Sequence, residues 1–351
     1  MEFAVGYQLG GEDEEPFAAV VAEFAEHVAE VYYAPPGAAS ARAPLPDDAA
    51  SCRRFECDLR AIRELGIGLN LLLNANCYGG LAMSRQLERR VVGYVRQLQQ
   101  LAGSAAAVTT TSPAVAAVVK RHFPGVPVLA SVSMRIGTVL GMEHLAELFD
   151  GYCVQRDHNR DMEHLRRLRR WADDHGKRLT LLANSGCLRF CPGQTFHDNL
   201  VSHEAEVAAA DNIEGFVPYV CWNLLRDRAR WPAVLQATWI RPEDLHHYEG
   251  LFAVVKLATR LHDRPWVVLR AYTQRRYEGN LLDLLEPGFG PAFAPWAVDN
   301  TRFPADWFAR TSTCGGRCED CLYCAEVLER VLVDLGEPGN SLLTPNTGRV
   351  R

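Results

Sequence analysis

Short apolar segments recur along the chain, and most are followed by stretches with apolar residues at helical spacing. We predict eight buried strands, at residues 3–8, 30–34, 66–76, 106–111, 126–133, 151–157, 178–184 and 252–258. Helices are predicted from Pro16, over 58–65, over 83–101 and from Ser112 onward. Short strands that alternate with helices predict a TIM-like (β/α)8 barrel, with an open doubly wound sheet as the alternative.

The connection between the seventh and eighth predicted strands is unusually long. Residues 185–250 form an insertion, and such an insertion in a parallel barrel lies on the catalytic face. Residues 1–285, with this insertion, are expected to form the barrel. Residues 286–335 form a cysteine-rich C-terminal extension that reads mostly as Pro/Gly-rich loops. The tail, residues 336–351, is expected to be disordered.

Composition narrows the class of protein. The formal net charge of −6 provides no overall basic field, so nucleic acid is not favoured as a partner. The chain has no apolar run long enough to span a membrane and no secretory signal, which leads us to expect a cytoplasmic protein. It also lacks the glycine-rich loops that bind nucleotides. Eleven cysteines in a reducing compartment favour metal binding over disulfides.

The cysteines of the second half of the chain fall into two groups. The first lies in the insertion and comprises Cys187, Cys191 and Cys221. The second lies in the extension and comprises Cys314, Cys318, Cys321 and Cys324. Four thiolates suit either zinc or an iron–sulfur cluster, and spacing alone does not separate the two. The Cys191–Pro192 step and the place of the first group favour iron–sulfur. Cys77, at the end of the third strand, is a candidate fourth ligand for that group.

Four segments resemble peptidase family U32, often called collagenase-like proteases: residues 154–165, 184–199, 237–260 and 272–285. The resemblance implies an α/β barrel with a 4Fe–4S cluster held by four cysteines. Members of the family include oxygen-independent hydroxylases of ubiquinone biosynthesis. They also include RNA hydroxylation enzymes thought to use prephenate as oxygen donor, and proteins linked to peptide or collagen cleavage.

The resemblance assigns the three insertion cysteines to the cluster. It leaves the fourth ligand open between Cys77 and one cysteine of the extension. The four extension cysteines depart from the ubiquinone members, and a second metal site, iron–sulfur or zinc, is the other reading of that group.

Several charged side chains are candidates for chemistry beside the cluster. Arg135, Arg160 and Arg241 would suit a carboxylate-bearing substrate or donor, and His158 and His197 could transfer protons. Each also has a purely structural explanation, such as pairing with a neighbouring acid or opening a helix.

We therefore expect an oxygen-independent hydroxylase, or a related oxidoreductase, that acts on a small biosynthetic intermediate. One alternative is a peptidase, although H-E-x-x-H and G-x-S-x-G motifs are absent from the sequence. The other is a non-catalytic metal-binding subunit. Because the ubiquinone enzymes work as pairs, the resemblance also implies a possible protein partner or heterodimer.

Overall fold

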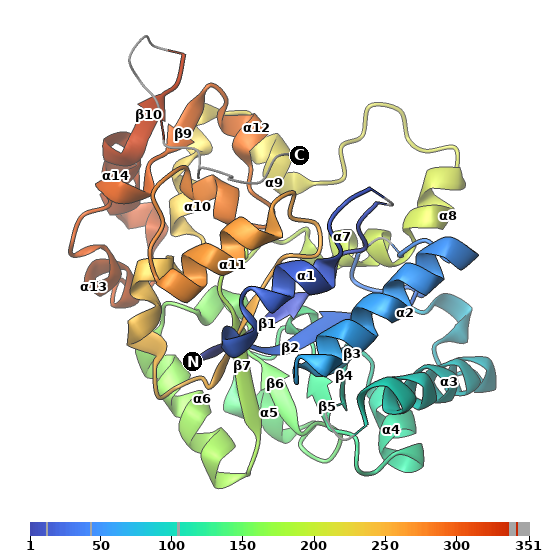
Figure 1. Ribbon diagram of the computed structural model, residues 1–351. Helices are drawn as coiled ribbons and strands as arrows, with labels where there is room; N and C mark the ends of the chain where they lie inside the picture. Colours follow the sequence, from blue (N-terminus) through green and yellow to red (C-terminus); the bar gives the residue numbers. More distant parts are fainter. Residues whose placement is uncertain (12, 43, 104–105, 337–341, 343–351) are drawn as a thin grey trace.

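Eight parallel strands close into a barrel in chain order (Figure 1). The computed structural model describes residues 1–11, 13–42, 44–103, 106–336 and 342. The strands are β1 (Glu2–Gly6), β2 (Val28–Tyr33), β3 (Gly68–Leu73), β4 (Ala106–Thr110), β5 (Val128–Ala130), β6 (Gly151–Cys153), β7 (Arg178–Leu182) and β8 (Val254–Leu257). All eight predicted strands are present. Because β1 pairs with β8, the barrel prediction is confirmed and the open sheet is wrong.

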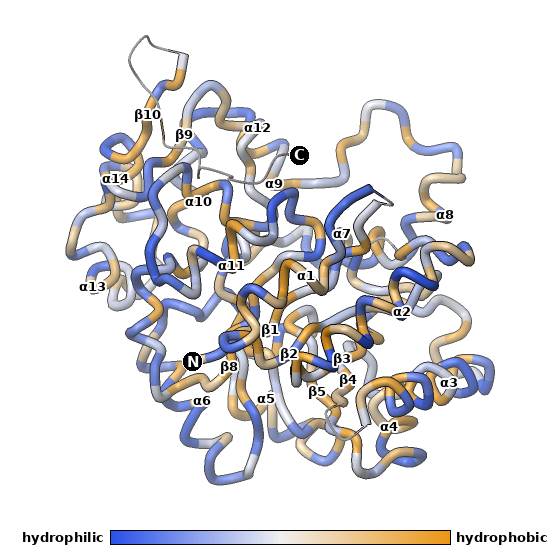
Figure 2. The backbone as a smooth tube through the Cα atoms, in the orientation of Figure 1, coloured by the Kyte–Doolittle hydropathy of each residue, from blue (hydrophilic) through white to orange (hydrophobic). Residues whose placement is uncertain are grey.

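Helices cover the outside of the barrel and lie between successive strands. They are α1 (Phe17–Ala22), α2 (Ala49–Glu64), α3 (Arg85–Ala102), α4 (Pro113–His122), α5 (Val139–Glu143), α6 (Met162–Asp174) and α11 (Pro265–Gln274). Figure 2 shows apolar strands surrounded by helices with hydrophilic outer faces. Helix α2 is longer than the predicted 58–65, because the Asp48 carboxylate accepts hydrogen bonds from the backbone N–H groups of Ala50 and Ser51 and starts the helix there.

The insertion between β7 and β8 is built from short helices. They are α7 (Gln194–Ser202), α8 (Glu204–Ala209), α9 (Val220–Leu224), α10 (Pro232–Gln236) and the 3-10 helices η5 (Arg228–Arg230) and η6 (Pro242–Tyr248). Short 3-10 turns elsewhere are η1 (Ala25–His27), η2 (Gly79–Leu81), η3 (Val132–Met134), η4 (Arg156–His158) and η7 (Leu281–Leu284). None of the helices in the described part of the chain combines the length and apolar character that crossing a membrane requires.

The extension contains regular elements rather than the loops that the sequence suggested. They are α12 (Gly290–Phe293), β9 (Trp296–Val298), η8 (Asn300–Arg302), α13 (Trp307–Ser312), η9 (Cys318–Asp320), α14 (Tyr323–Val331) and β10 (Leu332–Asp334). Strands β9 and β10 pair antiparallel, and α14 packs against α10 of the insertion (Figure 1). Extension residues such as Phe293 and Val331 belong to the same hydrophobic cluster as the barrel residue Phe3. The prediction for the tail falls outside the described residues, apart from Gly336 and Leu342.

Candidate active site

A cavity of about 400 Å³ opens at the carboxyl ends of the strands. Asn74, Arg156 and Arg260 line it from just beyond β3, β6 and β8, and the insertion adds Cys187 and His197. Its volume suits a small molecule, and the carboxyl end is where (β/α)8 enzymes place their chemistry.

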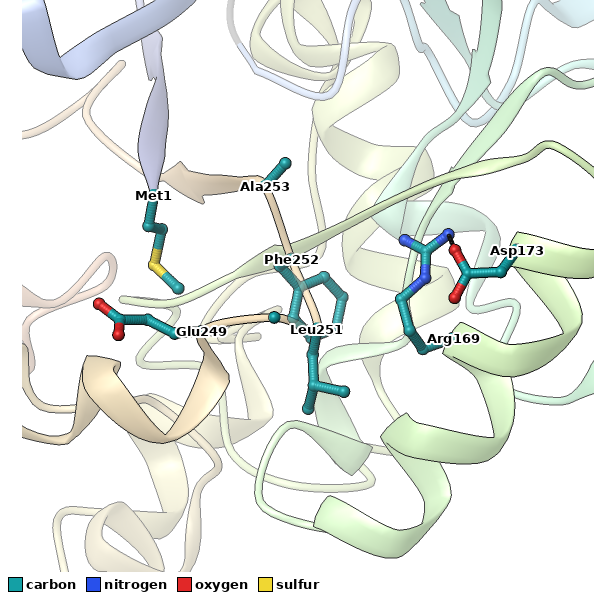
Figure 3. A pocket seen from close by; sticks show the side chains of 8 residues that line it. Met1, Arg169, Asp173, Glu249, Leu251, Phe252 and Ala253 are labelled. Atoms are coloured by element: carbon teal, nitrogen blue, oxygen red, sulfur yellow. Dashed lines mark ion pairs between the residues drawn. The ribbon is translucent and has the colours of Figure 1, made fainter.

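A second hollow, of about 440 Å³, lies at the opposite end of the barrel (Figure 3). Met1 and Phe252 line it just before β1 and β8, and Arg169 and Asp173 of α6 form an ion pair of 2.7 Å beside it. This amino-terminal end carries stability rather than catalysis in such barrels. The cavity at the carboxyl end of the barrel is therefore the candidate active site.

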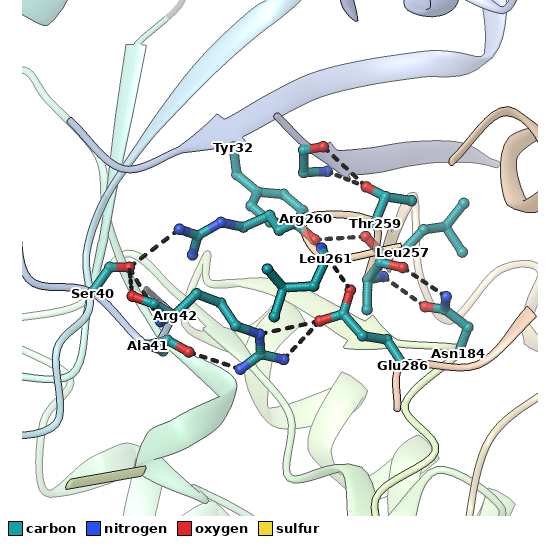
Figure 4. Close-up of polar contacts among 12 residues, drawn as sticks. Tyr32, Ser40, Ala41, Arg42, Asn184, Leu257, Thr259, Arg260, Leu261 and Glu286 are labelled. Atoms are coloured by element: carbon teal, nitrogen blue, oxygen red, sulfur yellow. Dashed lines mark hydrogen bonds and ion pairs between the residues drawn. The ribbon is translucent and has the colours of Figure 1, made fainter. Parts of the chain in front are cut away.

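Asn184 fixes the loop that leaves β7 for the cysteines. Its side-chain amide donates to the carbonyl of Ala258 (2.8 Å), and its oxygen accepts from the N–H of Ala258 (2.6 Å) (Figure 4). The same amide also donates to the carbonyl of Leu284 (2.9 Å). Next to it, Ser185 forms a β-bridge with Glu286. Asn184 thus links the loop after β7 to the end of β8 and to the segment before the extension by hydrogen bonds.

Gly186 lets the backbone of the β7 loop pass very close to Pro287. A Cβ atom at this position would lie 2.0 Å from the carbonyl oxygen of Pro287, which no side chain tolerates. The next residue is Cys187. The direction in which the first cysteine group enters the cavity is therefore set by tight backbone packing.

Glu286 and Arg42 form a partly buried ion pair at the cavity wall (Figure 4). Arg42 donates from Nη2 (2.8 Å) and Nε (3.2 Å) to Glu286 Oε1, and the N–H of Leu261 donates to Oε2 (3.3 Å). Burial opposes ionisation of Glu286, but the charge and hydrogen bonds of Arg42 hold its pKa below the ordinary value. Glu286 is therefore a fixed anion.

Three further basic side chains line the cavity: Arg156, Lys256 and Arg260. Among the described residues, none of them has a carboxylate within 4.0 Å. Lys256 Nζ lies 3.7 Å from the centre of the Tyr32 ring, and burial lowers its pKa. Burial and the nearby Arg42 charge lower the pKa of Arg260 to about 10. Unpaired cations in an enclosed site favour an anionic ligand.

Gly6 makes room for two of these groups. A Cβ atom here would lie 2.4 Å from Arg260 Cγ and 2.8 Å from the Tyr32 ring. Its N–H donates to Thr259 Oγ1 (2.8 Å), which joins the end of β1 to the end of β8. The place of Arg260 in the cavity therefore depends on a glycine at the end of β1.

The first cysteine group converges on the cavity. Cys187, Cys191 and Cys221 all line it. Burial, and then the neighbouring Cys187 thiol, raise the pKa of Cys221 to about 11, and Cys191 adds to the effect. The three thiols that the sequence grouped thus line one cavity at the carboxyl end of the barrel.

Cys77 lies elsewhere. Its thiol interacts with His203 and accepts from the N–H of Gly79 (3.3 Å). The preceding residue, Asn76, donates from its N–H to Ser202 at the end of α7, whereas Cys191 precedes the start of that helix. The nine residues of α7 place these ends about 12 Å apart. The structure does not bring Cys77 to the other three cysteines.

Of the two predicted histidines, the structure brings His197 to the cavity. His197 packs against the Tyr219 ring, with 5.0 Å between ring centres, and burial lowers its pKa. His158 stacks on His164 at 4.6 Å outside the cavity lining, and burial followed by the His164 charge lowers its pKa.

The three predicted arginines do not line the cavity. Arg135 is exposed and bonds to Thr195 of α7. Arg241 contacts Asn300 and forms an ion pair with Glu243 at 3.3 Å. Arg160 is 7% exposed and donates to the carbonyls of Leu235 and Trp239, so it holds the insertion together.

The sequence analysis missed the basic residues that do line the cavity. Lys256 stands within an apolar strand, and Arg156 and Arg260 each follow a strand end. Polar residues at the carboxyl ends of barrel strands are a known signal for a site. That signal was available once the strands were assigned.

Comparison with known proteins begins with sequence. No protein-family model matches the chain. A region of 161 residues is 32% identical to an uncharacterized protease of Methanocaldococcus jannaschii, and it covers 44% of this chain and 46% of the relative. The aligned region thus spans about half the length of the curated relative.

A solved structure with a similar fold is also a peptidase by name. The structure of the U32 peptidase Mk0906 superposes with a TM-score of 0.52 at 16% identity, over 74% of this chain and 93% of the other. This likeness shows that the chain shares the fold of a U32 peptidase. The α/β barrel that the resemblance to family U32 implies is thereby confirmed. An α-amylase from Lactobacillus plantarum matches less well, with a TM-score of 0.37 at 12% identity over 53% of this chain and 62% of the other.

The thiols at the cavity can be compared with the ligands that an iron–sulfur cluster requires. Thiolates are the ligands such clusters take, and three thiols share the cavity wall. In the described part of the chain, no three His, Cys, Asp or Glu side chains are gathered closely enough for a single metal ion. It is the chemistry of their donor atoms that suits the three cysteines to an iron–sulfur cluster.

Proposed function

We propose that this chain is an iron–sulfur enzyme that acts on a carboxylate-bearing small molecule in the cavity at the carboxyl end of the barrel. The observation that carries the proposal is the meeting, in one cavity, of three thiols with the unpaired cations Arg156, Lys256 and Arg260. By analogy with the hydroxylases that its family includes, the reaction would be an oxygen-independent hydroxylation, with a carboxylate donor such as prephenate supplying the oxygen.

In this proposal the cysteines hold the cluster and the cations hold the substrate. Cys187, Cys191 and Cys221 would be thiolate ligands, and the bound cluster would supply a Lewis acid or a one-electron centre. Arg260 and Lys256 would bind the substrate carboxylate. Glu286 keeps Arg42 engaged, so that Arg42 shapes the wall and leaves the ligand to the other cations.

His197 is the group suited to move a proton. Because burial lowers its pKa, it is neutral near pH 7 and can accept a proton. Its neighbour Asp198 also lines the cavity, and burial raises the pKa of this carboxyl group, with Arg156 opposing the shift. The two titratable groups lie next to each other in the sequence and both line the cavity.

Anaerobic purification tests the proposal. We expect a brown protein with absorption near ~400 nm, and loss of about four irons in Cys187→Ser and in Cys221→Ser. Cys57→Ser, on the exposed face of α2, is the matched control and should retain all iron. Wild-type protein that binds no iron, or Cys187→Ser that keeps it, would refute the role of this group.

Peptide cleavage is the second candidate, and the names of the relatives favour it. The same cavity would hold the peptide, with its acidic side chains or carboxyl terminus on the cations. Hydrolysis of gelatin or a fluorogenic peptide by metal-free protein, abolished in His197→Ala, would support the peptidase and count against the hydroxylase.

A further inference from the structure

The four extension cysteines lie in one turn-rich segment between α13 and α14. Gly315 and Gly316 have φ values of +67° and +73°, which glycine adopts without strain, and they turn the chain after Cys314. The N–H of Cys321 donates to the carbonyl of Cys318 (3.4 Å), and Cys324 stands in the first turn of α14. Cys324 interacts electrostatically with the other three thiols.

A buried cation lies beside this segment. Arg160 lies beside the stacked rings of Trp239 and Trp307, with its guanidinium carbon 4.4 Å and 4.9 Å from the two ring centres. Its hydrogen bonds go to carbonyl oxygens, and among the described residues no carboxylate lies within 4.0 Å. The thiols of Cys314 and Cys324 are among the groups that act on its charge. Tyr248 and Asp244 act on it as well, although Asp244 forms no ion pair with it. Because burial of a charge is costly, further negative charge beside Arg160 would stabilise it.

A second cation reaches the segment from the first cysteine group. Arg189 stands between Cys187 and Cys191, and its guanidinium covers Gly316, where a Cβ atom would lie 2.6 Å from Nη1. Its Nε donates to the carbonyl of Asp157 (3.1 Å), which holds the side chain in place, and its charge acts on Cys318. Arg160 and Arg189 together provide two positive charges at the extension thiols.

We propose that Cys314, Cys318, Cys321 and Cys324 bind a second iron–sulfur cluster, and that Arg160 and Arg189 neutralise its negative charge. A 4Fe–4S cluster in its oxidised state carries a net charge of about −2 with four thiolates, which two guanidinium groups balance. Four thiolates also suit a zinc ion, and metal analysis separates the two.

The second site is separate from the cavity. None of the four extension cysteines lines the cavity, whereas all three insertion cysteines do. The electrostatic neighbours of Cys221 are Cys187 and Cys191, and those of Cys324 are the other extension thiols. The extension group therefore forms a centre of its own and does not lend its fourth thiol to the insertion group.

Metal analysis of paired variants tests the proposal. Wild-type protein, purified without oxygen, should hold about eight irons and eight sulfides. Cys318→Ser/Cys321→Ser should lose about four of each, and Cys187→Ser/Cys191→Ser should lose the other four. Cys52→Ser/Cys57→Ser, on α2, is the matched control and should lose none.

Each other outcome has a definite meaning. About four irons that only the extension pair removes would support the second site and overturn the proposed cluster in the cavity. About four irons that either pair removes would mean one shared cluster and would overturn the second site. One zinc per chain at the extension, or an extension pair with unchanged iron, would also overturn it.

Alkylation of wild-type protein gives an answer that does not depend on folding of variants. Trypsin separates residues 311–317, with Cys314, from residues 318–330, with the other three extension cysteines. Both peptides should resist iodoacetamide until the metal is removed, while exposed Cys57 reacts at once. Immediate alkylation of both peptides in native protein would refute the site.

The role of Arg160 has its own readout. In the Cys187→Ser/Cys191→Ser background, Arg160→Met should make the reduction potential of the remaining cluster more negative, because a positive charge stabilises the reduced state. Arg160→Lys should restore most of the shift. Circular dichroism confirms folding, and a potential unchanged in Arg160→Met would refute the role of Arg160 as counter-ion.

Discussion

The ion pair between Glu286 and Arg42 gives the sharpest test of how the cavity wall is held. Glu286 is 10% exposed and Arg42 is 31% exposed, so Glu286→Gln leaves a guanidinium that water reaches only in part. Breaking a fully buried pair costs about 3–5 kcal/mol. Because Arg42 regains some solvation, we expect Glu286→Gln to lower the free energy of unfolding by about 2–3 kcal/mol at pH 7.

The loss should depend on pH in a defined direction. The pKa of Glu286 is lowered in the folded protein, so its stabilisation is complete above the unfolded value of about 4.3. It disappears as pH falls through the lower, folded pKa. The difference between wild type and Glu286→Gln should therefore be full at pH 7 and should shrink below about pH 4.

Urea unfolding at several pH values measures both effects. Glu56→Gln is the matched control, because Glu56 and Arg60 form an ion pair of 3.9 Å with both side chains more than half exposed. That variant should change stability by less than about 0.5 kcal/mol. A loss in Glu286→Gln no larger than the control, or equal at pH 7 and pH 3.5, would refute the reasoning.

Three further predictions concern the cavity. Gly6→Ala should destabilise the protein by about 1–3 kcal/mol, because the added Cβ overlaps Arg260. Gly93→Ala, on α3 in open space, is the control and should stabilise by about 0.5–1 kcal/mol. Urea unfolding compares the two variants, and equal effects would contradict the packing at Gly6. Lys256→Met should weaken binding of a small dicarboxylate such as malate about tenfold by calorimetry. In wild type, binding should fall as pH rises through a Lys256 pKa below the ordinary value, and unchanged affinity in the variant would exclude Lys256 from the anion site. Asn184→Ala removes three buried hydrogen bonds and should cost about 2–4 kcal/mol of unfolding free energy, which a loss below about 1 kcal/mol would contradict.

The barrel could be predicted from the sequence because its signals are local. Each of the eight strands is a short apolar run, and α3 repeats buried residues at three- and four-residue spacing, as in Leu87, Val91, Val95 and Leu98. The elements of the extension could not be found in this way. Strands β9 and β10 have three residues each, too few for a period, and they exist because they pair with each other.

Residues of the site could be predicted only where reactive side chains lie close together in the sequence. Cys187 and Cys191 are four residues apart and do meet at the cavity. Arg160 was a candidate for substrate binding, but Trp239 and Trp307 bury it, and these contacts span about 80 and 150 residues. Nothing in the sequence near Arg160 indicates which surface its guanidinium will meet.

The packing of Arg160 has a consequence for exchanging parts among related barrels. Its guanidinium contacts both Trp239 of the insertion and Trp307 of the extension, whose rings stack on each other, while α10 of the insertion packs against α14 of the extension. Neither segment completes its hydrophobic contacts without the other. A chimera that takes the insertion from one relative and the extension from another should fail to assemble, whereas one that transfers both together should fold. The insertion and the extension would then have to change together whenever either is exchanged between relatives.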